Sequence, residues 1–403
     1  MHRIKPMLTR RRLWFAPLLL LLGWLLSGCA ELRYYGQAVA GQWRLLRQRR
    51  PVDRVLADPA TPADLQQRLE TARRLRDFAS TELALPENGS YRSYADLHRP
   101  YVVLNVFAAP EFSLQLREWC FPVVGCVNYR GYFNADAAKL LADSLRAQGE
   151  DVYLGSVPAY STLGWFDDPL LNTFIDWPTG RFAELIFHEL AHQRLFIAGD
   201  TDFNESFATF VGQLGARRWL ERHGTPEESK AYADYNRRHE EFLALLLASR
   251  QQLERLYASS ESAAAKRAGK HRLLAELCER YRALKQNWGG YAGYDSWFAD
   301  DLNNAKLGAV HAYTRFVPAF ETLFARSGGD FTVFYQAATA VGKLPPIRRE
   351  ACLRALLQGN ACAAGGSIAG ATAPEPLANR DPPGGAWPRS DTPAHPDDGN
   401  GGT

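Results

Sequence analysis

The stretch Phe187-His188-Glu189-Leu190-Ala191-His192 is the feature around which this chain is organised. Its pattern is His-Glu-x-x-His, and on an α-helix this spacing sets two imidazole rings one turn apart on the same face. The two rings can then bind one divalent metal ion. Glu189 lies about 100° around the helix from His188, close enough to reach a water molecule beside such an ion. The motif therefore predicts a helix with two metal ligands and an adjacent carboxylate.

A zinc site that performs chemistry has three protein ligands and one open position. The third ligand is expected at Glu205, which comes thirteen residues after His192, at the start of a second predicted helix. A helix–turn–helix of that length can return Glu205 to the two histidines. His188, His192 and Glu205 would then form a His₂Glu set, the ligand set of thermolysin-type zinc enzymes. The alternative is that both histidines are structural residues of a buried helix.

The second predicted helix carries small residues on the side of the expected third ligand. Ala208 and Gly212 lie three and seven residues after Glu205, so they would allow a close approach of the two helices, although ordinary packing accounts for them equally well. One bound zinc ion would lower the pKa of its water towards about 7. Glu189 could then take the proton of that water and pass it to a leaving amine. The sequence therefore predicts amide hydrolysis.

Residues 1–28 have the features of an export signal. They have a basic start, an apolar run at residues 13–26 and small residues at the end. A lone transmembrane anchor is the alternative, but the run is short for a span of about 20 residues and contains Pro17. We therefore expect residues 1–28 to be a signal peptide.

The residues that follow the apolar run indicate lipid attachment. Leu26-Ser27-Gly28-Cys29 resembles the lipobox of bacterial lipoproteins, in which the cysteine is lipidated and becomes the new N-terminus. Several acyl chains on one cysteine hold a protein stably on a membrane. Ala30 follows Cys29 at the position where an inner-membrane retention signal would usually have Asp. We therefore expect a bacterial envelope protein on the periplasmic side of the outer membrane.

Five cysteines follow the lipobox, and in an oxidising periplasm they are expected to form disulfides rather than metal or redox sites. Cys120 and Cys126 flank a turn sequence and are the first expected pair. In the loop-entropy model so short a loop contributes about 2 kcal/mol. Cys352 and Cys362 are a second candidate pair, and Cys278 is expected to be a buried thiol.

Composition and charge limit the possible partners. The chain has 403 residues, of which 46% are hydrophobic and 12% aromatic, as in a globular protein with a large core. The five cations of residues 1–28 exceed the net charge of +3, which leaves −2 for the remainder. With no basic surplus, nucleic acid is not an expected partner.

The pattern along the chain predicts an α+β fold that is predominantly α-helical. We expect a helical segment at residues 29–100, a zincin-like catalytic core at 101–225 and a C-terminal helical part of the same domain at 226–360. Residues 361–403 are rich in glycine and proline and predict a disordered tail. The small β-sheet before the metal helix has strands expected at residues 101–107, 123–133 and 152–157.

Several helices can be placed in more detail. The metal helix is expected to begin with Thr179 as its N-cap. The arginines of the helix after Pro62 predict a solvated surface, and they are Arg68, Arg73, Arg74 and Arg76. The remaining helices are expected at residues 135–148, at 204–222, as a hairpin at 227–283 and as three helices in 303–360.

With these motifs the chain resembles the family of predicted zinc aminopeptidases that are bacterial envelope lipoproteins, in the gluzincin group. The resemblance covers roughly residues 30–355. It implies His188, His192 and Glu205 as ligands and Glu189 as the catalyst. The stretches that carry it are PENGSYRSY at 86–94, NVFAAPEF at 105–112, YRGYF at 129–133, GWFDDP at 164–169, the metal segment 184–211 and NNA at 303–305.

One position departs from the thermolysin-like pattern. Thr209 stands four residues after Glu205, where those enzymes often carry an acid that orients a ligand histidine. The orienting acid is therefore expected elsewhere, with Asp200 and Asp202 as candidates.

Candidate substrate-binding residues lie outside the metal segment. Asp167 and Asp168 could bind the free amine of a peptide, although a turn and helix cap before Pro169 accounts for them equally well. Residues 153–166 could pair with an extended peptide as an edge strand. The oxyanion also needs a donor, and the candidates are Tyr129, Tyr291, Tyr294, His311 and Tyr313.

Two functions fit this sequence. The first is a lipid-anchored zinc peptidase, an aminopeptidase by its resemblance, with a peptide or protein substrate and the membrane as a second partner through Cys29. The second is a non-catalytic or chaperone-like envelope lipoprotein that uses a zincin fold for binding. The long helices, the anchor and the tail motivate this second function. The two differ in whether Glu189 is required.

Overall fold

The structure is a computed structural model that describes the backbone of residues 15–121, 125–159, 161–299, 301–311 and 315–362. The expected tail at 361–403 therefore lies outside the described residues from residue 363 onward. The molecule is α+β and predominantly helical, as predicted. Among the described residues, no helix is both long enough and apolar enough to cross a membrane.

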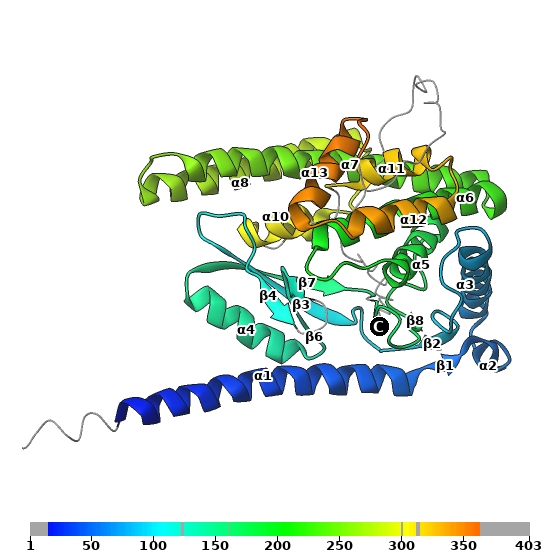
Figure 1. The fold of residues 1–403 in the computed structure, drawn as a ribbon, viewed down its shortest axis with the longest axis horizontal. Helices are drawn as coiled ribbons and strands as arrows, with labels where there is room; N and C mark the ends of the chain where they lie inside the picture. Colours follow the sequence, from blue (N-terminus) through cyan, green and yellow to red (C-terminus); the bar gives the residue numbers. More distant parts are fainter. Residues whose placement is uncertain (1–14, 122–124, 160, 300, 312–314, 363–403) are drawn as a thin grey trace, which may run out of the picture.

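Three helices form the N-terminal part. Helix α1 (Phe15–Gln48) runs along one edge of the molecule, and α2 (Val52–Leu56) and α3 (Ala63–Thr81) follow it (Figure 1). At Cys29 only the helical backbone is described, so the expected lipid site has no described side chain. Pro51 and Pro62 stand directly before α2 and α3, where the missing backbone donor of proline costs nothing, whereas inside a helix it would be needed.

The main sheet has the order β6–β3–β7 and is antiparallel throughout. Its strands are β3 (Val103–Pro110), β6 (Arg130–Tyr132) and β7 (Glu150–Val157). In the register, Val106 lies opposite both Arg130 and Leu154. The expected strand at 123–133 is two strands, because β5 (Gly125–Val127) pairs with β4 (Trp119–Phe121) in a separate hairpin. Cys120 and Cys126 face each other across this hairpin and form a disulfide.

Helices cover both faces of the main sheet. Helix α4 (Ala135–Ala147) packs on one face, where Val106 and Ala108 are buried. Helix α10 (Asn304–His311) packs on the other, against Phe107 and Ala109 (Figure 1). Successive side chains of a strand point to opposite faces, and because both faces are covered, β3 is apolar except at the buried Asn105.

A small second sheet connects the N-terminal part to the chain before the metal helix. Strand β1 (Arg50–Pro51) pairs antiparallel with β2 (Ser93–Ala95), and β2 pairs parallel with β8 (Leu170–Leu171). Leu170 and Leu171 belong to the largest hydrophobic core cluster, which extends from Leu45 to Leu356. The N-terminal and C-terminal helical parts therefore share one core.

The C-terminal part is helical. Helices α7 (Pro226–Ala258) and α8 (Ala263–Asn287) form the expected hairpin, and the short α9 (Asp295–Ala299) follows. Four helices follow α9 where three were expected: α10 is separate from α11 (Val317–Arg326), and α12 (Phe331–Gly342) and α13 (Pro346–Leu357) complete the part. Pro318 lies in the first turn of α11, where a helix needs no backbone donor.

The remaining cysteines differ from one another. Cys352 and Cys362 form a second disulfide. Cys278 is free and only partly buried, so the expectation of a buried thiol is wrong. The reason is its place on α8, which packs on α7 along one side and leaves its other side open to solvent.

Candidate metal centre

Two consecutive helices build the centre. Helix α5 (Thr179–Arg194) carries His188 and His192, and α6 (Thr201–His223) carries Glu205. Thr179 was expected to be the N-cap of α5, but the N-cap is Pro178 and Thr179 is the first residue of the helix. The hydroxyl of Thr179 donates to Glu228 Oε1 at 2.6 Å. The position differs by one residue because the side chain is used for a contact with α7.

The three expected ligands lie together. The Nε2 atoms of His188 and His192 are 3.1 Å apart, and Glu205 Oε2 lies 3.4 Å from the first and 3.8 Å from the second. Four tetrahedral bonds of about 2.0–2.1 Å to zinc place neighbouring donor atoms about 3.3 Å apart. The separations in the structure match this spacing, so the triangle of donor atoms can bind one metal ion.

The protonation of the histidines also suits a metal ion. Burial lowers the pKa of His188 to about 3 and that of His192 to about 4. Both imidazoles are therefore neutral near pH 7, and the neutral ring is the form that binds metals. Burial raises the pKa of the Glu205 carboxyl, because the charged form loses its hydration. A cation between these groups would offset that loss.

A side-chain clamp turns the chain from α5 into α6. Asn204 Nδ2 donates to the carbonyl of Ile197 at 2.7 Å, and Asn204 Oδ1 accepts from the N–H of Ile197 at 2.7 Å. Asp200 caps α6 by accepting from the N–H of Phe203 at 3.0 Å. These bonds fix the position of Glu205, which is the next residue. Sequence reasoning missed the role of Asn204, whose only signal was its place directly before the ligand.

The two helices approach closely at Gly212. A Cβ atom there would lie 2.7 Å from the Glu184 carbonyl oxygen and 3.2 Å from His188 Cβ. Such distances leave no room for a methyl group. The expected need for a small residue is therefore confirmed at Gly212, and Ala208 is fully buried in the same contact region.

The carboxyl of Glu189 is buried beside the triangle. Its pKa is raised well above the usual value, first by burial and then by the nearby charges of Glu205 and Asp168. A carboxyl with a raised pKa exchanges protons near neutral pH more readily than an ordinary glutamate does. The position and the environment both suit a general acid–base residue.

The expected orienting acids do not reach the histidines. Asp200 accepts from Arg349 Nε at 2.7 Å, and Asp202 pairs with Arg315 at 3.1 Å. Both carboxylates are used to hold α6 against the C-terminal helices. Within the described residues, His192 Nδ1 has no hydrogen-bond partner. The prediction of Asp200 or Asp202 as orienting residues is therefore wrong.

The expected amine-binding acids also have other contacts. The Asp168 carboxylate accepts from the N–H of Thr162 at 3.0 Å and from Gln193 Nε2 at 3.3 Å. Burial raises the pKa of Asp168 to about 6. The carboxylate of Asp167 lies against Gly89, where an added Cβ would meet Asp167 Oδ2 at 2.5 Å. Neither acid is among the described residues that line the cavity of the centre, and amine binding by Asp167 or Asp168 stays a prediction.

The triangle opens on a cavity of about 490 Å³. Its walls come from segments that are far apart in sequence, including Tyr34 of α1, Tyr153 of β7, His239 of α7 and Lys306 of α10. Lys306 is fully buried, with its Nζ 5.1 Å from the centre of the Trp297 ring. Sequence reasoning missed these wall residues, because no local pattern shows which distant segments meet.

Of the candidate oxyanion donors, Tyr129 is the one placed at the cavity. Its pKa is raised by burial and then by the charges of Glu205 and Glu189, which shows that it lies near both. Tyr294 instead bonds to His239, with its hydroxyl 3.0 Å from Nδ1. Tyr291 is not among the described lining residues, and neither the side chain of His311 nor Tyr313 is described.

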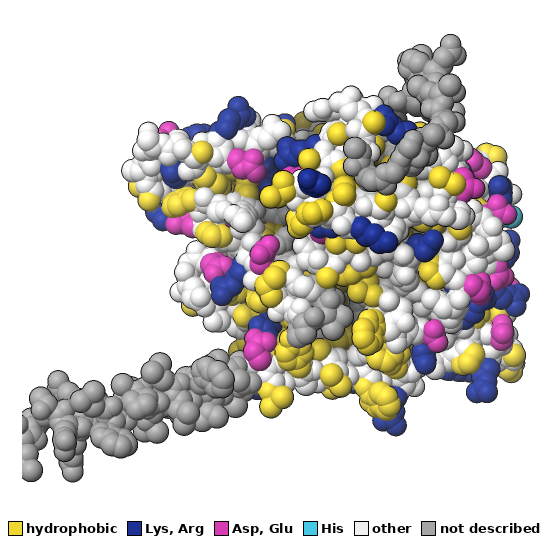
Figure 2. All heavy atoms as spheres, in the orientation of Figure 1, with side chains coloured by type: hydrophobic (Ala, Val, Ile, Leu, Met, Phe, Trp, Pro, Cys, Tyr) yellow, Lys and Arg dark blue, Asp and Glu magenta, His cyan; other side chains and the backbone are white. Residues whose placement is uncertain are grey.

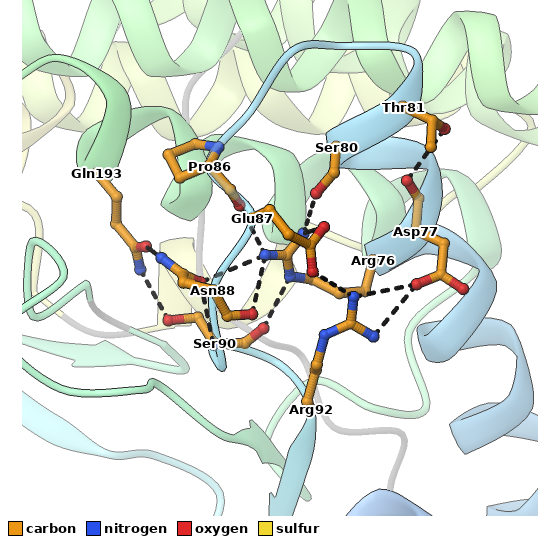
Figure 3. Close-up of polar contacts among 10 residues, drawn as sticks. All are labelled: Arg76, Asp77, Ser80, Thr81, Pro86, Glu87, Asn88, Ser90, Arg92 and Gln193. Carbon is orange, nitrogen blue, oxygen red and sulfur yellow. Dashed lines mark hydrogen bonds and ion pairs between the residues drawn. The ribbon is translucent and has the colours of Figure 1, made fainter.

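A buried arginine supports the end of the metal helix (Figure 3). Arg76 of α3 has no exposed surface and donates to the carbonyls of Pro86 at 2.6 Å, Asn88 at 3.1 Å and Ser90 at 2.9 Å. Asn88 Nδ2 in turn donates to Gln193 Oε1 at 2.7 Å. The predicted solvated arginine face is thus wrong at Arg76, because the 86–90 loop packs over it and supplies carbonyl acceptors.

Arg68 is a second exception on the same face. It donates to the carbonyl of Ile175 at 2.6 Å and to that of Trp177. These two carbonyls belong to the segment before α5. Arg68 therefore fixes the segment before the metal helix, and Arg76 fixes the loop that contacts Gln193 at its end. Their spacing in the sequence does not distinguish these two arginines from the exposed Arg73.

The fold and the centre define an α+β protein with a buried His–His–Glu group that can bind a metal ion. Residues 33–353 match the sequence model of a family described as "Putative aminopeptidase", and the chain belongs to this family. Membership supports a peptidase function in general. Comparisons with curated proteins and with solved structures found no match.

Proposed function

We propose that this chain is a zinc-dependent aminopeptidase of the gluzincin type, with a zincin-like fold, anchored by lipid on Cys29 in the bacterial envelope. The observation that carries the proposal is the triangle of His188, His192 and Glu205, with the Glu189 carboxyl buried beside it. The family match supports peptide hydrolysis. The signal-like residues 1–28 and the lipobox support the envelope, on the periplasmic face of the outer membrane.

Three ligands leave one position of a tetrahedral site open to the cavity. A zinc ion held there would act as a Lewis acid on the substrate carbonyl and would ease the loss of a proton from water. Glu189 would act as the general base that accepts this proton from water, and then as the general acid that gives it to the leaving amine. Its buried carboxyl with a raised pKa suits both directions of transfer.

Tyr129 would donate its hydroxyl hydrogen bond to the oxyanion that forms on the substrate carbonyl. It lines the cavity and lies near Glu189 and Glu205, as the cause of its raised pKa shows. The tyrosine stays protonated near neutral pH and so remains a donor. The aromatic and aliphatic walls of the cavity would exclude bulk water, which strengthens these polar contacts.

The test uses the chain that begins at Ala30. We expect about one zinc ion per chain and hydrolysis of a peptide library. Glu189→Gln should retain the zinc and lower turnover at least about 100-fold, because general acid–base groups contribute about 100-fold to 10,000-fold. Glu184→Gln is the matched control, since it neutralises a buried glutamate of the same helix that bonds to Tyr232. It should keep most of the activity.

Two results would contradict the proposal. One is activity that survives complete removal of metal by a chelator, and the other is full turnover by Glu189→Gln. The positions of the cuts in the library also distinguish trimming from the N-terminus from internal cleavage. If Glu189→Gln restores function in a strain that lacks the gene, the non-catalytic alternative is favoured instead.

A further inference from the structure

The inner face of α1 belongs to the folded body. Tyr34 and Ala38 line the cavity of the metal centre, and Leu45 is buried in the largest core cluster. At Gly41 an added Cβ would lie 2.2 Å from Phe133 Cγ, so the helix backbone packs closely against the residue that follows β6 of the main sheet. One side of α1 is therefore covered by the rest of the folded molecule.

The outer face of the same helix is also apolar. Leu32, Tyr35, Val39 and Trp43 have exposed fractions of 74%, 41%, 69% and 61%. Their spacing of three, four and four residues places them in one stripe along the helix. Hydrophobic side chains lie along this lower edge of the molecule in Figure 2. An ordinary surface helix has polar residues there, so the outward face of α1 is the reverse of the usual pattern.

The charges beside the stripe are positive. Arg33, Arg44 and Arg47 are exposed on α1, and within the described part of the chain none of them forms an ion pair. From residue 31 onward the helix has one acidic residue, Glu31, and it pairs with Arg130 at 2.9 Å. The surface therefore combines an apolar stripe with unneutralised cations.

The residues before the stripe indicate which kind of surface the stripe contacts. In the described part of the chain, helix α1 begins at Phe15, inside the apolar run, and its backbone continues without a break through Cys29 to Leu32. The stripe from Leu32 to Trp43 spans eleven residue-to-residue steps, or about 16 Å at about 1.5 Å per step. Apolar residues flanked by arginine, with tryptophan at one end, are the features of a helix that lies in the interface of a bilayer.

From these observations we propose that the stripe of Leu32, Tyr35, Val39 and Trp43 is a membrane-contact surface that lies on an anionic lipid bilayer. Arg33, Arg44 and Arg47 contact the headgroups. The proposal goes beyond the peptidase function and is independent of zinc and of lipid on Cys29. It also has a structural consequence: one helix would contact lipid with its outer face and form a wall of the cavity with its inner face.

The test uses the chain that begins at Ala30, which removes the apolar run and the lipidated cysteine. All members of the described core clusters come at or after Tyr34, so this chain keeps the described core. Vesicles of phosphatidylethanolamine and phosphatidylglycerol are mixed with the protein and floated on a density gradient. We expect the protein to float with them, and to float less with vesicles of phosphatidylcholine alone.

The variant Val39→Glu/Trp43→Glu should lower the affinity for the anionic vesicles at least about tenfold, because it places charge where apolar side chains enter the interface. Ile347→Glu is the matched control. Ile347 is 85% exposed and lies on α13, on the other side of the molecule from α1 (Figure 1), so this variant should bind as the parent does. Circular dichroism of all three proteins checks that they are folded.

Three outcomes would overturn the proposal. The first is that the parent chain binds vesicles of no composition. The second is that the double variant binds as well as the parent. The third is a dimer of the parent in solution that dissociates in the double variant while vesicles remain unbound, which would make the stripe an interface between two copies. None of these outcomes depends on peptidase activity, so the proposed function stands or falls separately.

Discussion

The close contact of α5 with α6 at Gly212 makes a quantitative prediction. In Gly212→Ala, the new methyl carbon would lie 2.7 Å from the Glu184 carbonyl oxygen and 3.2 Å from His188 Cβ. An ordinary contact of this kind needs about 3.4 Å, so the helices must separate by about half an ångström or more. Overpacking of this size costs about 1–3 kcal/mol.

The intrinsic preference of a helix for alanine over glycine opposes the cost of the close contact. It must be measured separately before that cost can be determined. Alanine stabilises the interior of a helix by about 1 kcal/mol relative to glycine, whatever its neighbours. Gly36→Ala in α1 isolates this effect, because an added Cβ there meets no atom within 4 Å. We expect Gly36→Ala to be neutral or stabilising and Gly212→Ala to be destabilising. The difference between them should be about 1–3 kcal/mol.

Urea unfolding of the metal-free proteins measures both free energies, and competition with a chelating dye measures zinc affinity. Gly212→Ala should also weaken zinc binding about tenfold, because it shifts the helix of Glu205 away from the helix of the histidines. Gly36→Ala should leave zinc binding unchanged. If both variants have the same stability and the same zinc affinity, then the contact is not tight and the reasoning is refuted.

Two further predictions concern buried polar groups. Burial raises the pKa of the Glu184 carboxyl from 4.5 to about 7, so the folded protein holds a proton that the unfolded chain releases in this range. The contribution of Glu184 to stability should be full below pH 4.5 and fall by about 3 kcal/mol as the pH rises through 7, and Glu184→Gln should remove this part of the slope in urea titrations across that range. Arg76→Met should lower the free energy of unfolding by about 3 kcal/mol or more, because it leaves buried carbonyls without donors. Arg73→Met, which changes an arginine 47% exposed, should stay within about 0.5 kcal/mol, and equal effects of the two would contradict the role of Arg76.

The predictions from sequence succeeded where helix geometry alone decides the outcome. His188 and His192 share a face because four residues make about one turn of any α-helix. The break between the helices and the position of Glu205 followed from turn residues and spacing, and the structure brings the three side chains together. The Cys120–Cys126 pair formed because its short loop leaves few other partners within reach.

The predictions failed where burial by a distant segment decides the outcome. Arg76 and Arg73 belong to the same helix and have similar neighbours in sequence, yet one is buried and the other exposed. The difference comes from the 86–90 loop, whose carbonyls receive the guanidinium. Asp200 was a candidate to orient a ligand histidine, but its carboxylate accepts a hydrogen bond from Arg349 of the C-terminal helix α13 instead.

The sequence by itself predicted the His188, His192 and Glu205 group, the neighbouring carboxyl of Glu189 and most of the order of helices and strands, because these depend on the spacing between neighbouring residues. The tertiary structure decided the walls of the cavity, the burial of Glu184 and the outward direction of the apolar stripe on α1. Each of these depends on which face of an element another element covers. That choice is made by packing between segments far apart in sequence, and no local spacing records it.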